Sequence, residues 1–296
     1  MQQQRGGAGQ ARSRDRLRDT ALVLVGHGST RNLNSSAPTR RLAEALRRRG
    51  LFAEVTACFW KEDPPLREVL AGVKAAEVFV VPNFAGVGYF THEVIPREMG
   101  LSGPLTEVAG VQGDMRRIYY TPPIGAHPRL ALLVRRRVEA VARYHNLDKT
   151  DLCLLLVGHG SRRPGGSSET AEALAADLER QGGFKSIRTA YLEQEPRVVA
   201  WPSFVPERQI LVMPLLIAEG LHGSEDLPPL FGLSTTDLAV INRVPAIGPA
   251  LLHGRRLWYC RGIGTDPDII DIVLDQVARI SGTPQGMWMG GAFCKP

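Results

Sequence analysis

The hydrophobic pattern of the chain begins in the same way in both halves. Apolar runs without polar alternation occupy residues 21–25 (ALVLV) and 152–157 (LCLLLV), as in strands buried on both faces of a parallel sheet. A Gly- and Ser-rich turn follows each run, and apolar residues then recur at helical spacing. Gly50 and Gly182 follow these stretches, where a helix is expected to end. Each half therefore opens with a predicted strand, turn and helix.

The alternation of strands and helices continues through both halves. Further strands are predicted at 51–58, 78–82 and near 117–120 in the first half, and at 186–192, 210–214 and 256–260 in the second. Prolines open the helix after each second strand, and long final helices are predicted at 127–144 and 267–280. Strands alternating with helices predict a parallel sheet covered on both faces. We predict two tandem flavodoxin-like three-layer α/β domains, packed side by side.

The two halves are also related by sequence. VGHGS occurs at 25–29 and at 157–161, an offset of 132, and RRIYYTPPIGAHPRL resembles RRLWYCRGIGTDPDI at an offset of 139. Several equivalent segments in one order indicate a duplicated unit of about 130 residues, an ordinary domain size. The predicted organisation is a disordered basic tail at 1–19, domains at 20–148 and 149–282, and a C-terminal tail at 283–296.

Composition excludes several classes of protein. The 296 residues are 44% hydrophobic and 22% charged, and the first 20 hold five Arg and two Asp, half of the net charge of +6. The remaining body is only mildly basic, which argues against nucleic-acid binding. No apolar run approaches the ~20 residues of a membrane span. Four scattered cysteines without a CxxC favour neither a disulfide framework nor a zinc site. We expect a cytoplasmic protein, monomeric or weakly homo-oligomeric.

Potentially reactive side chains follow three predicted strands in each half. Ligands bind outside the carboxyl ends of the strands in open parallel sheets. The side chains expected at those ends are His27, Lys61, Glu62 and His92 in the first half, and His159, Glu193 and His222 in the second. Two imidazoles and a carboxylate suit Co, Ni, Fe or Zn, and they can also accept protons.

Other chemistries fit the sequence less well. Neither GHGST nor GHGSR provides the G-x-S-x-G of a nucleophile elbow, both lack the third Gly of a dinucleotide fingerprint, and no phosphate-binding P-loop is present in the sequence. The Gly-Ser turn can hold a carboxylate or phosphate on its N–H groups. Ser29 and Ser161 are expected to form local hydrogen bonds, while Arg162 fits either carboxylate binding or a solvated loop. The remaining histidines are interpreted as structural: His127, His145 and His253.

The VGHGS turn, the "YLE..P" segment and "PLLIAEGLHGSEDLP" together resemble the CbiX-type sirohydrochlorin chelatases of the class II chelatase group. The resemblance covers residues from about 20 to 280, once per unit, as in the long, two-unit members. It implies a lyase that inserts Co(II) into sirohydrochlorin in cobalamin synthesis, with the metal as a substrate and no organic cofactor. Relatives insert Fe(II) for siroheme, or Ni(II). A siroheme ferrochelatase and a non-catalytic metal or tetrapyrrole carrier remain alternatives.

The resemblance also implies roles for particular residues. The metal-handling trio of the family falls on His159, Glu193 and His222. In the first half the histidines fall on His27 and His92, whereas the glutamate position falls on Lys61, beside Glu62, and the G-x-H spacing is lost. The candidate contacts for sirohydrochlorin flank the first histidines: Ser29, Gly160, Ser161 and Arg162.

Overall fold

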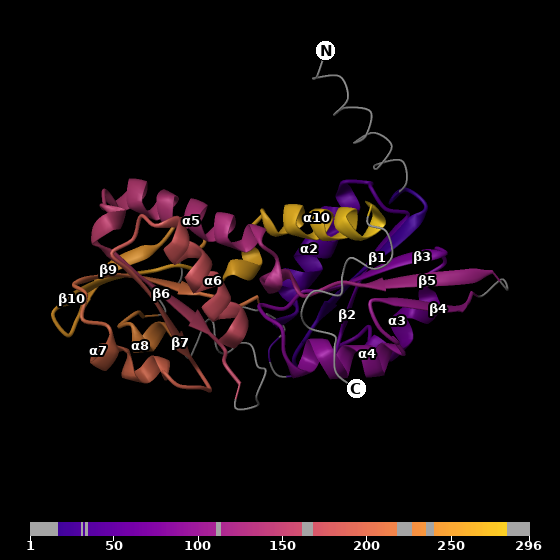
Figure 1. Ribbon diagram of the computed structural model, residues 1–296, viewed down its shortest axis with the longest axis horizontal. Helices are drawn as coiled ribbons and strands as arrows, with labels where there is room; N and C mark the ends of the chain where they lie inside the picture. The colour runs from indigo at the N-terminus through magenta and orange to yellow at the C-terminus, as the bar shows by residue number, and fades with distance from the viewer. Residues whose placement is uncertain are drawn as a thin grey trace, which may run out of the picture.

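The computed structural model describes residues 17–30, 32, 35–110, 114–161, 168–217, 227–234 and 240–282 as two α/β halves (Figure 1). The first half contains β1 (Thr20–Gly26), α2 (Ala37–Arg48), β2 (Glu54–Phe59), α3 (Leu66–Gly72), β3 (Glu77–Pro82), η2 (Phe90–Val94), α4 (Ile95–Met99), β4 (Leu105–Ala109), β5 (Met115–Tyr120), η3 (Ile124–Ala126) and α5 (Arg129–His145). The second contains η4 (Lys149–Asp151), β6 (Leu152–Gly158), α6 (Ser168–Gln181), β7 (Ser186–Tyr191), η5 (Val198–Ala200), α7 (Trp201–Phe204), β8 (Gln209–Pro214), α8 (Leu227–Leu230), β9 (Ile247–Leu252), β10 (Arg255–Tyr259), η7 (Ile263–Thr265) and α10 (Ile269–Gly282).

Each half is built on a five-stranded sheet, ordered β2-β1-β3-β5-β4 in the first half and β7-β6-β8-β10-β9 in the second. Four strands of each sheet are parallel, which confirms the predicted α/β fold. The central strands β1 and β6 are buried along their whole length, which explains their unbroken apolar runs. The sheets differ from the prediction at one edge, where β4 and β9 run antiparallel to β5 and β10. Gly248-Pro249 interrupts the apolar pattern of β9.

The last helix of each half covers the sheet of the other half. In Figure 1, α5 lies beside α6 over the second sheet, and α10 lies beside α2 over the first. The Arg135 guanidinium of α5 donates to the Gly182 carbonyl at the end of α6 (2.9 Å) and lies over the Phe184 ring. Apolar residues of both halves form one continuous core. The two halves are therefore joined by reciprocal exchange of their terminal helices.

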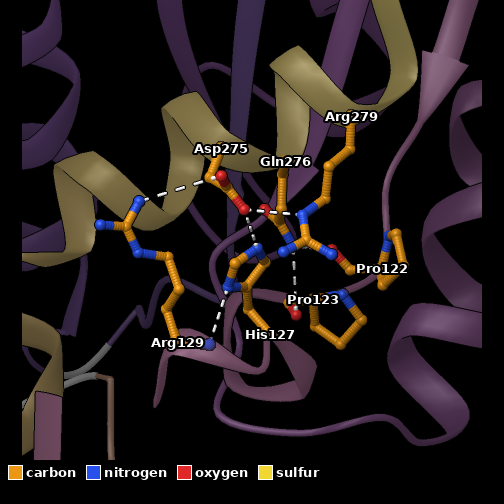
Figure 2. Close-up of polar contacts among 7 residues, drawn as sticks. All are labelled: Pro122, Pro123, His127, Arg129, Asp275, Gln276 and Arg279. Atoms are coloured by element: carbon orange, nitrogen blue, oxygen red, sulfur yellow. Dashed lines mark hydrogen bonds and ion pairs between the residues drawn. The ribbon is translucent and has the colours of Figure 1, made fainter. Parts of the chain in front are cut away.

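Each exchanged helix also binds a turn of the opposite half. Gln276 of α10 donates to the carbonyls of Pro122 and Pro123 (2.9 and 3.4 Å; Figure 2). At the equivalent place in α5, Arg137 donates to the carbonyls of Arg261 and Gly262 (2.7 and 3.3 Å). Because both contacts satisfy carbonyls of irregular backbone, each helix is fixed in position as well as buried.

An ion pair lies beside each of these contacts, and the exchanged helix supplies the acidic residue in one pair and the basic residue in the other. Asp275 of α10 faces Arg129 of the first half (3.9 Å), whereas Arg136 of α5 pairs with Asp268 of the second half. These pairs stand at equivalent positions, 139 residues apart. Arg129 is the first residue of α5 and Asp268 directly precedes α10, so each pair joins the start of one helix to the middle of the other.

Replacing Arg137 by alanine is expected to destabilise the protein by about 1.5–3 kcal/mol, because its mostly buried guanidinium makes charge-assisted bonds to two carbonyls. Its neighbour Arg136 provides a matched control, since that side chain is 57% exposed and makes a surface ion pair. Arg136→Ala should cost less than about 1 kcal/mol. Urea unfolding of the two variants measures the difference, and equal losses would contradict the proposed anchoring.

His127 lies in the same interface and is structural, as expected from sequence. Its Nδ1 accepts a hydrogen bond from the Arg129 backbone N–H (3.1 Å), and its Nε2 lies 2.9 Å from Asp275 Oδ2 (Figure 2). Burial lowers the pKa of His127 and outweighs the opposite effect of Asp275. The imidazole is therefore neutral in the folded protein over a wider pH range than in the unfolded chain.

Acidification through the ordinary histidine range is expected to remove the stability that neutral His127 supplies. That contribution is complete above pH ~6.5, and it decreases below this value because the unfolded chain binds the proton more readily. His127→Asn keeps a side-chain acceptor for the Arg129 N–H, as Asp266 does for Asp268 in the second half, but it does not titrate. Chemical unfolding from pH 7.5 to 5 should show a weaker pH dependence for the variant. An unchanged slope would exclude this role.

The structure also bears on the N-terminal segment, on the cysteines and on membrane-spanning helices, within the residues it describes. In the N-terminal segment, Leu17 is buried and its carbonyl accepts a hydrogen bond from Thr20 Oγ1 (2.8 Å), whereas residues 1–16 and 283–296 lie outside the description. The three described cysteines are free thiols in the interior: Cys58, Cys153 and Cys260. Among the described helices, none is long and apolar enough to cross a membrane.

Candidate metal and tetrapyrrole site

The candidate site is built on the turns that follow β1 and β6. Gly28 and Gly160 adopt left-handed backbone with φ of +67° and +76°, which side chains other than Gly rarely tolerate. A Cβ added to Gly28 would lie 3.0 Å from the Cβ of Phe59, and one added to Gly160 would lie 2.8 Å from the Cβ of Tyr191. The glycine after each histidine therefore allows a sharp turn close to the neighbouring strand.

These turns hold both imidazoles in one tautomer. His27 Nδ1 lies 2.9 Å from the Gly28 carbonyl, and His159 Nδ1 lies 3.1 Å from the Gly160 carbonyl. A carbonyl only accepts hydrogen bonds, so Nδ1 carries the proton in each ring. The lone pair then resides on Nε2, which suits metal ligation or proton acceptance. The duplicated sequence thus gives both histidines the same contact between Nδ1 and the following carbonyl.

The two histidines influence each other electrostatically although they belong to different halves. The pKa of His27 is lowered, mainly by burial, and further by the positive charges of Lys61 and of protonated His159. The hydrogen bond to the Gly28 carbonyl opposes this shift without cancelling it. The Phe90 ring lies 4.8 Å from the His27 ring and supplies part of the apolar surroundings. The site therefore favours neutral His27.

The segments after β2 and β7 attach to the histidine turns through backbone hydrogen bonds. The Lys61 N–H donates to the His27 carbonyl (3.0 Å), and the Glu193 N–H donates to the His159 carbonyl (2.9 Å). Lys61 and Glu193 thus occupy equivalent places, as their sequence offset predicts. An ammonium group stands in the first half where the second half has a carboxylate.

The structure places some of the remaining candidates and leaves others outside its description. His92 lies on the π-helical turn η2, two residues after Phe90, and its N–H donates to the Gly88 carbonyl (2.9 Å). His222 and Arg162 are outside the described residues. Among the described residues, no group of three His, Cys, Asp or Glu side chains is placed to hold a metal ion. The His159–Glu193–His222 trio therefore stays a prediction.

The serines next to the histidines contribute through their backbone. The Ser29 N–H donates to Glu62 Oε1 (2.6 Å), and the Ser161 N–H donates to Gln194 Oε1 (3.2 Å). Ser29 Oγ also accepts a hydrogen bond from the Asn32 N–H (3.3 Å), which is the local bonding expected from sequence. Sequence reasoning missed the roles of Glu62 and Gln194. The available signal was their common offset of 132 residues.

Together, the fold and the site define a class of protein: a duplicated α/β protein in which a histidine follows the first strand of each half and donates from Nδ1 to the next carbonyl. The family model named CbiX matches residues 21–141 and 153–280, and the chain belongs to the CbiX family. The resemblance seen in the sequence motifs is thereby confirmed.

Named relatives include proteins of full and of half length. The "Probable sirohydrochlorin cobaltochelatase" of Halobacterium salinarum is 33% identical over 278 residues, covering 90% of this chain and 93% of the relative. The "Sirohydrochlorin cobaltochelatase" of Methanopyrus kandleri is 28% identical over 142 residues, which cover 44% of this chain and 98% of the relative. A relative about as long as one half of this chain is thus named for the same activity as the full-length relative.

Solved structures share the fold. A multi-domain protein of Deinococcus radiodurans, described as structurally similar to chelatases, has a TM-score of 0.65 and 33% identity. The match covers 88% of this chain but only 54% of that protein. The sirohydrochlorin chelatase SirB of Bacillus subtilis, solved with cobalt, has a TM-score of 0.61, 18% identity and coverage of 90% of this chain and 97% of its own. At that identity, the similarity concerns the fold alone.

Proposed function

We propose that this protein is a sirohydrochlorin cobaltochelatase, a lyase that inserts Co(II) into sirohydrochlorin in cobalamin biosynthesis. The observation that carries the proposal is the pair of imidazoles, His27 and His159, which come from the two halves, share the same Nδ1 contact to the following carbonyl and influence each other electrostatically. Family membership and the printed activity of the relatives support the same reaction.

The reaction requires two events at one place. A divalent metal enters the flat macrocycle, and the two pyrrolic N–H protons leave, so one M²⁺ replaces two H⁺. In this proposal, His159 and His222 bind the metal or accept protons and Glu193 assists them. His27 and His92 contribute from the first half. Neutral imidazole can perform either task, because Nε2 has an available lone pair.

Sirohydrochlorin also carries eight carboxylates that need partners. In this proposal, the turns beside the histidines supply them, through Ser29, Gly160, Ser161 and Arg162. The Lys61 ammonium acts electrostatically on His27, and a substrate carboxylate bound there would neutralise its charge. The chemistry requires only a divalent metal ion and groups that accept two protons, so we propose that no organic cofactor takes part. We also propose that the enzyme is cytoplasmic and acts without nucleic acid or membrane.

Anaerobic incubation of catalytic amounts of the protein with sirohydrochlorin and Co²⁺, Fe²⁺ or Ni²⁺ tests this function. The absorbance of the macrocycle reports metal insertion. We expect many turnovers per protein, with Co²⁺ fastest at equal free metal concentration. A faster reaction with Fe²⁺ would favour a siroheme ferrochelatase. Binding without turnover would favour a carrier.

A further inference from the structure

One peptide unit in each half is held by hydrogen bonds on both sides. The Gly28 carbonyl accepts from His27 Nδ1, while the N–H of the same peptide unit, on Ser29, donates to Glu62 Oε1. In the second half, the Gly160 carbonyl accepts from His159 Nδ1, and the Ser161 N–H donates to Gln194 Oε1. A side-chain oxygen is thus linked to each imidazole through one backbone amide.

This linkage matters because the peptide unit follows a glycine. Gly28 and Gly160 have left-handed φ angles, and glycine populates several turn conformations at similar energy. If the peptide unit rotated by about 180°, its carbonyl would leave the imidazole and its N–H would take that place. The Nδ1 proton would lose its acceptor, and the ring could change tautomer. An acceptor on the Ser N–H opposes that rotation.

The linkage has a different chemical strength in the two halves. Glu62 is a carboxylate, and its bond to the Ser29 N–H is 2.6 Å, whereas the amide oxygen of Gln194 accepts at 3.2 Å. The Nη2 atom of Arg40 orients Glu62 from its other side: it lies 3.4 Å from Oε2 and donates to the Asp63 carbonyl (2.7 Å). Charged acceptors form the stronger hydrogen bonds, and linked bonds reinforce one another.

We propose that Glu62 and Gln194 are positioning residues for metal insertion. Each holds the Gly–Ser peptide so that its carbonyl retains the Nδ1 proton and the adjacent imidazole directs its Nε2 lone pair to the metal or the pyrrole protons. The proposal rests on the proposed function for its kinetic consequences, but not for the state of the histidine rings.

Variants at position 62 separate positioning from general stabilisation. Glu62→Gln keeps an oxygen acceptor and copies the second half, so kcat should stay within about threefold of the wild type. Glu62→Ala removes the acceptor, and kcat should fall about 10- to 100-fold, as expected when a hydrogen bond that supports a metal-ligating histidine is lost. KM for sirohydrochlorin should change little. Gln194→Ala should act in the same way through His159.

Glu54→Ala provides a matched control at the opposite end of β2. Glu54 Oε1 also accepts from backbone N–H groups, those of Lys74 and Ala75 (both 2.9 Å), but at the amino edge of the sheet. This variant should lower the melting temperature and leave kcat unchanged. An equal loss of kcat in Glu54→Ala and Glu62→Ala would overturn the positioning role.

The tautomer of His27 gives a readout that does not depend on turnover. NMR of the full-length, metal-free protein with ¹⁵N-labelled histidine distinguishes Nδ1–H from Nε2–H rings, and His27→Ala identifies the signals. We expect the Nδ1–H form in the wild type and Glu62→Gln, and mixed tautomers in Glu62→Ala. An unchanged ring in Glu62→Ala overturns the inference even if the enzyme turns over. Absence of turnover in the wild type, with the tautomer change present, overturns the proposed function alone.

Discussion

Replacing His159 by alanine is expected to lower the rate of metal insertion at least ~100-fold, the range over which a positioned acid–base or ligand group contributes. His27→Ala should also be slower, but by a smaller factor. The second half retains Glu193 and the G-x-H histidine in the expected order, whereas the first has Lys61 at the glutamate position. Initial rates with saturating Co²⁺ and sirohydrochlorin measure both effects.

The order of these two effects is the informative part. In both imidazoles Nδ1 donates to the carbonyl of the following glycine, so this contact does not distinguish the two histidines. Their neighbours differ in charge, and that difference is expected to set the ranking. An inactive His27→Ala with a nearly normal His159→Ala would transfer the main site to the first half. His253→Ala, whose ring packs edge-on against Trp201 in the second half, serves as a control for the loss of a histidine elsewhere.

Replacing Gly264 or Gly125 by alanine is expected to destabilise the protein strongly, by about 3 kcal/mol, as an overpacked core does. A Cβ on Gly264 would lie 2.0 Å from the Ile217 carbonyl oxygen, and one on Gly125 would lie 1.8 Å from that of Ala85. Backbone must move in both cases. Ile217 precedes His222 by five residues, so Gly264→Ala should also reduce the rate of metal insertion in protein that remains folded.

Thermal unfolding and initial rates below the transition measure these effects. Gly72→Ala is the matched control, because a Cβ at this helical position meets no atom within 4 Å. Alanine favours helix over glycine by up to about 1 kcal/mol, so the control should be neutral or slightly stabilised. A melting temperature for Gly264→Ala close to that of the control would show that the backbone at Ile217 moves at little cost and would contradict the prediction.

Much of the fold could be predicted because burial leaves a signal in the sequence. The runs at 21–25 and 152–157 predicted the central strands, and the glycines at 50 and 182 marked helix ends at α2 and α6. The edge strands β4 and β9 were missed because an edge strand has only one neighbouring strand and is less buried, so its sequence need not contain a continuous apolar run. The helix exchange was missed for another reason: an apolar stripe shows that a helix is covered, but not which sheet covers it.

The candidate site shows the same division between pattern and geometry. The repeated VGHGS turn indicated His27 and His159 directly, because glycines on both sides of a histidine need a structural reason. The partners of the turns were not evident. Glu62 and Gln194 accept a hydrogen bond from a backbone N–H, a task that many polar residues can perform, so their common offset of 132 residues pairs them without indicating this role. Only the duplicated structure shows that both do the same work.

The exchange of α5 and α10 has a consequence for the order of events on the ribosome. The helix that covers the first sheet begins at Ile269, after the rest of the second half has been translated. At 5–20 residues per second, the interval between the end of α5 at His145 and the end of α10 at Gly282 is roughly 7–27 s. During that time the first sheet lacks the cover that α10 will supply, so we expect the nascent first half to depend on chaperones until the last helix leaves the exit tunnel.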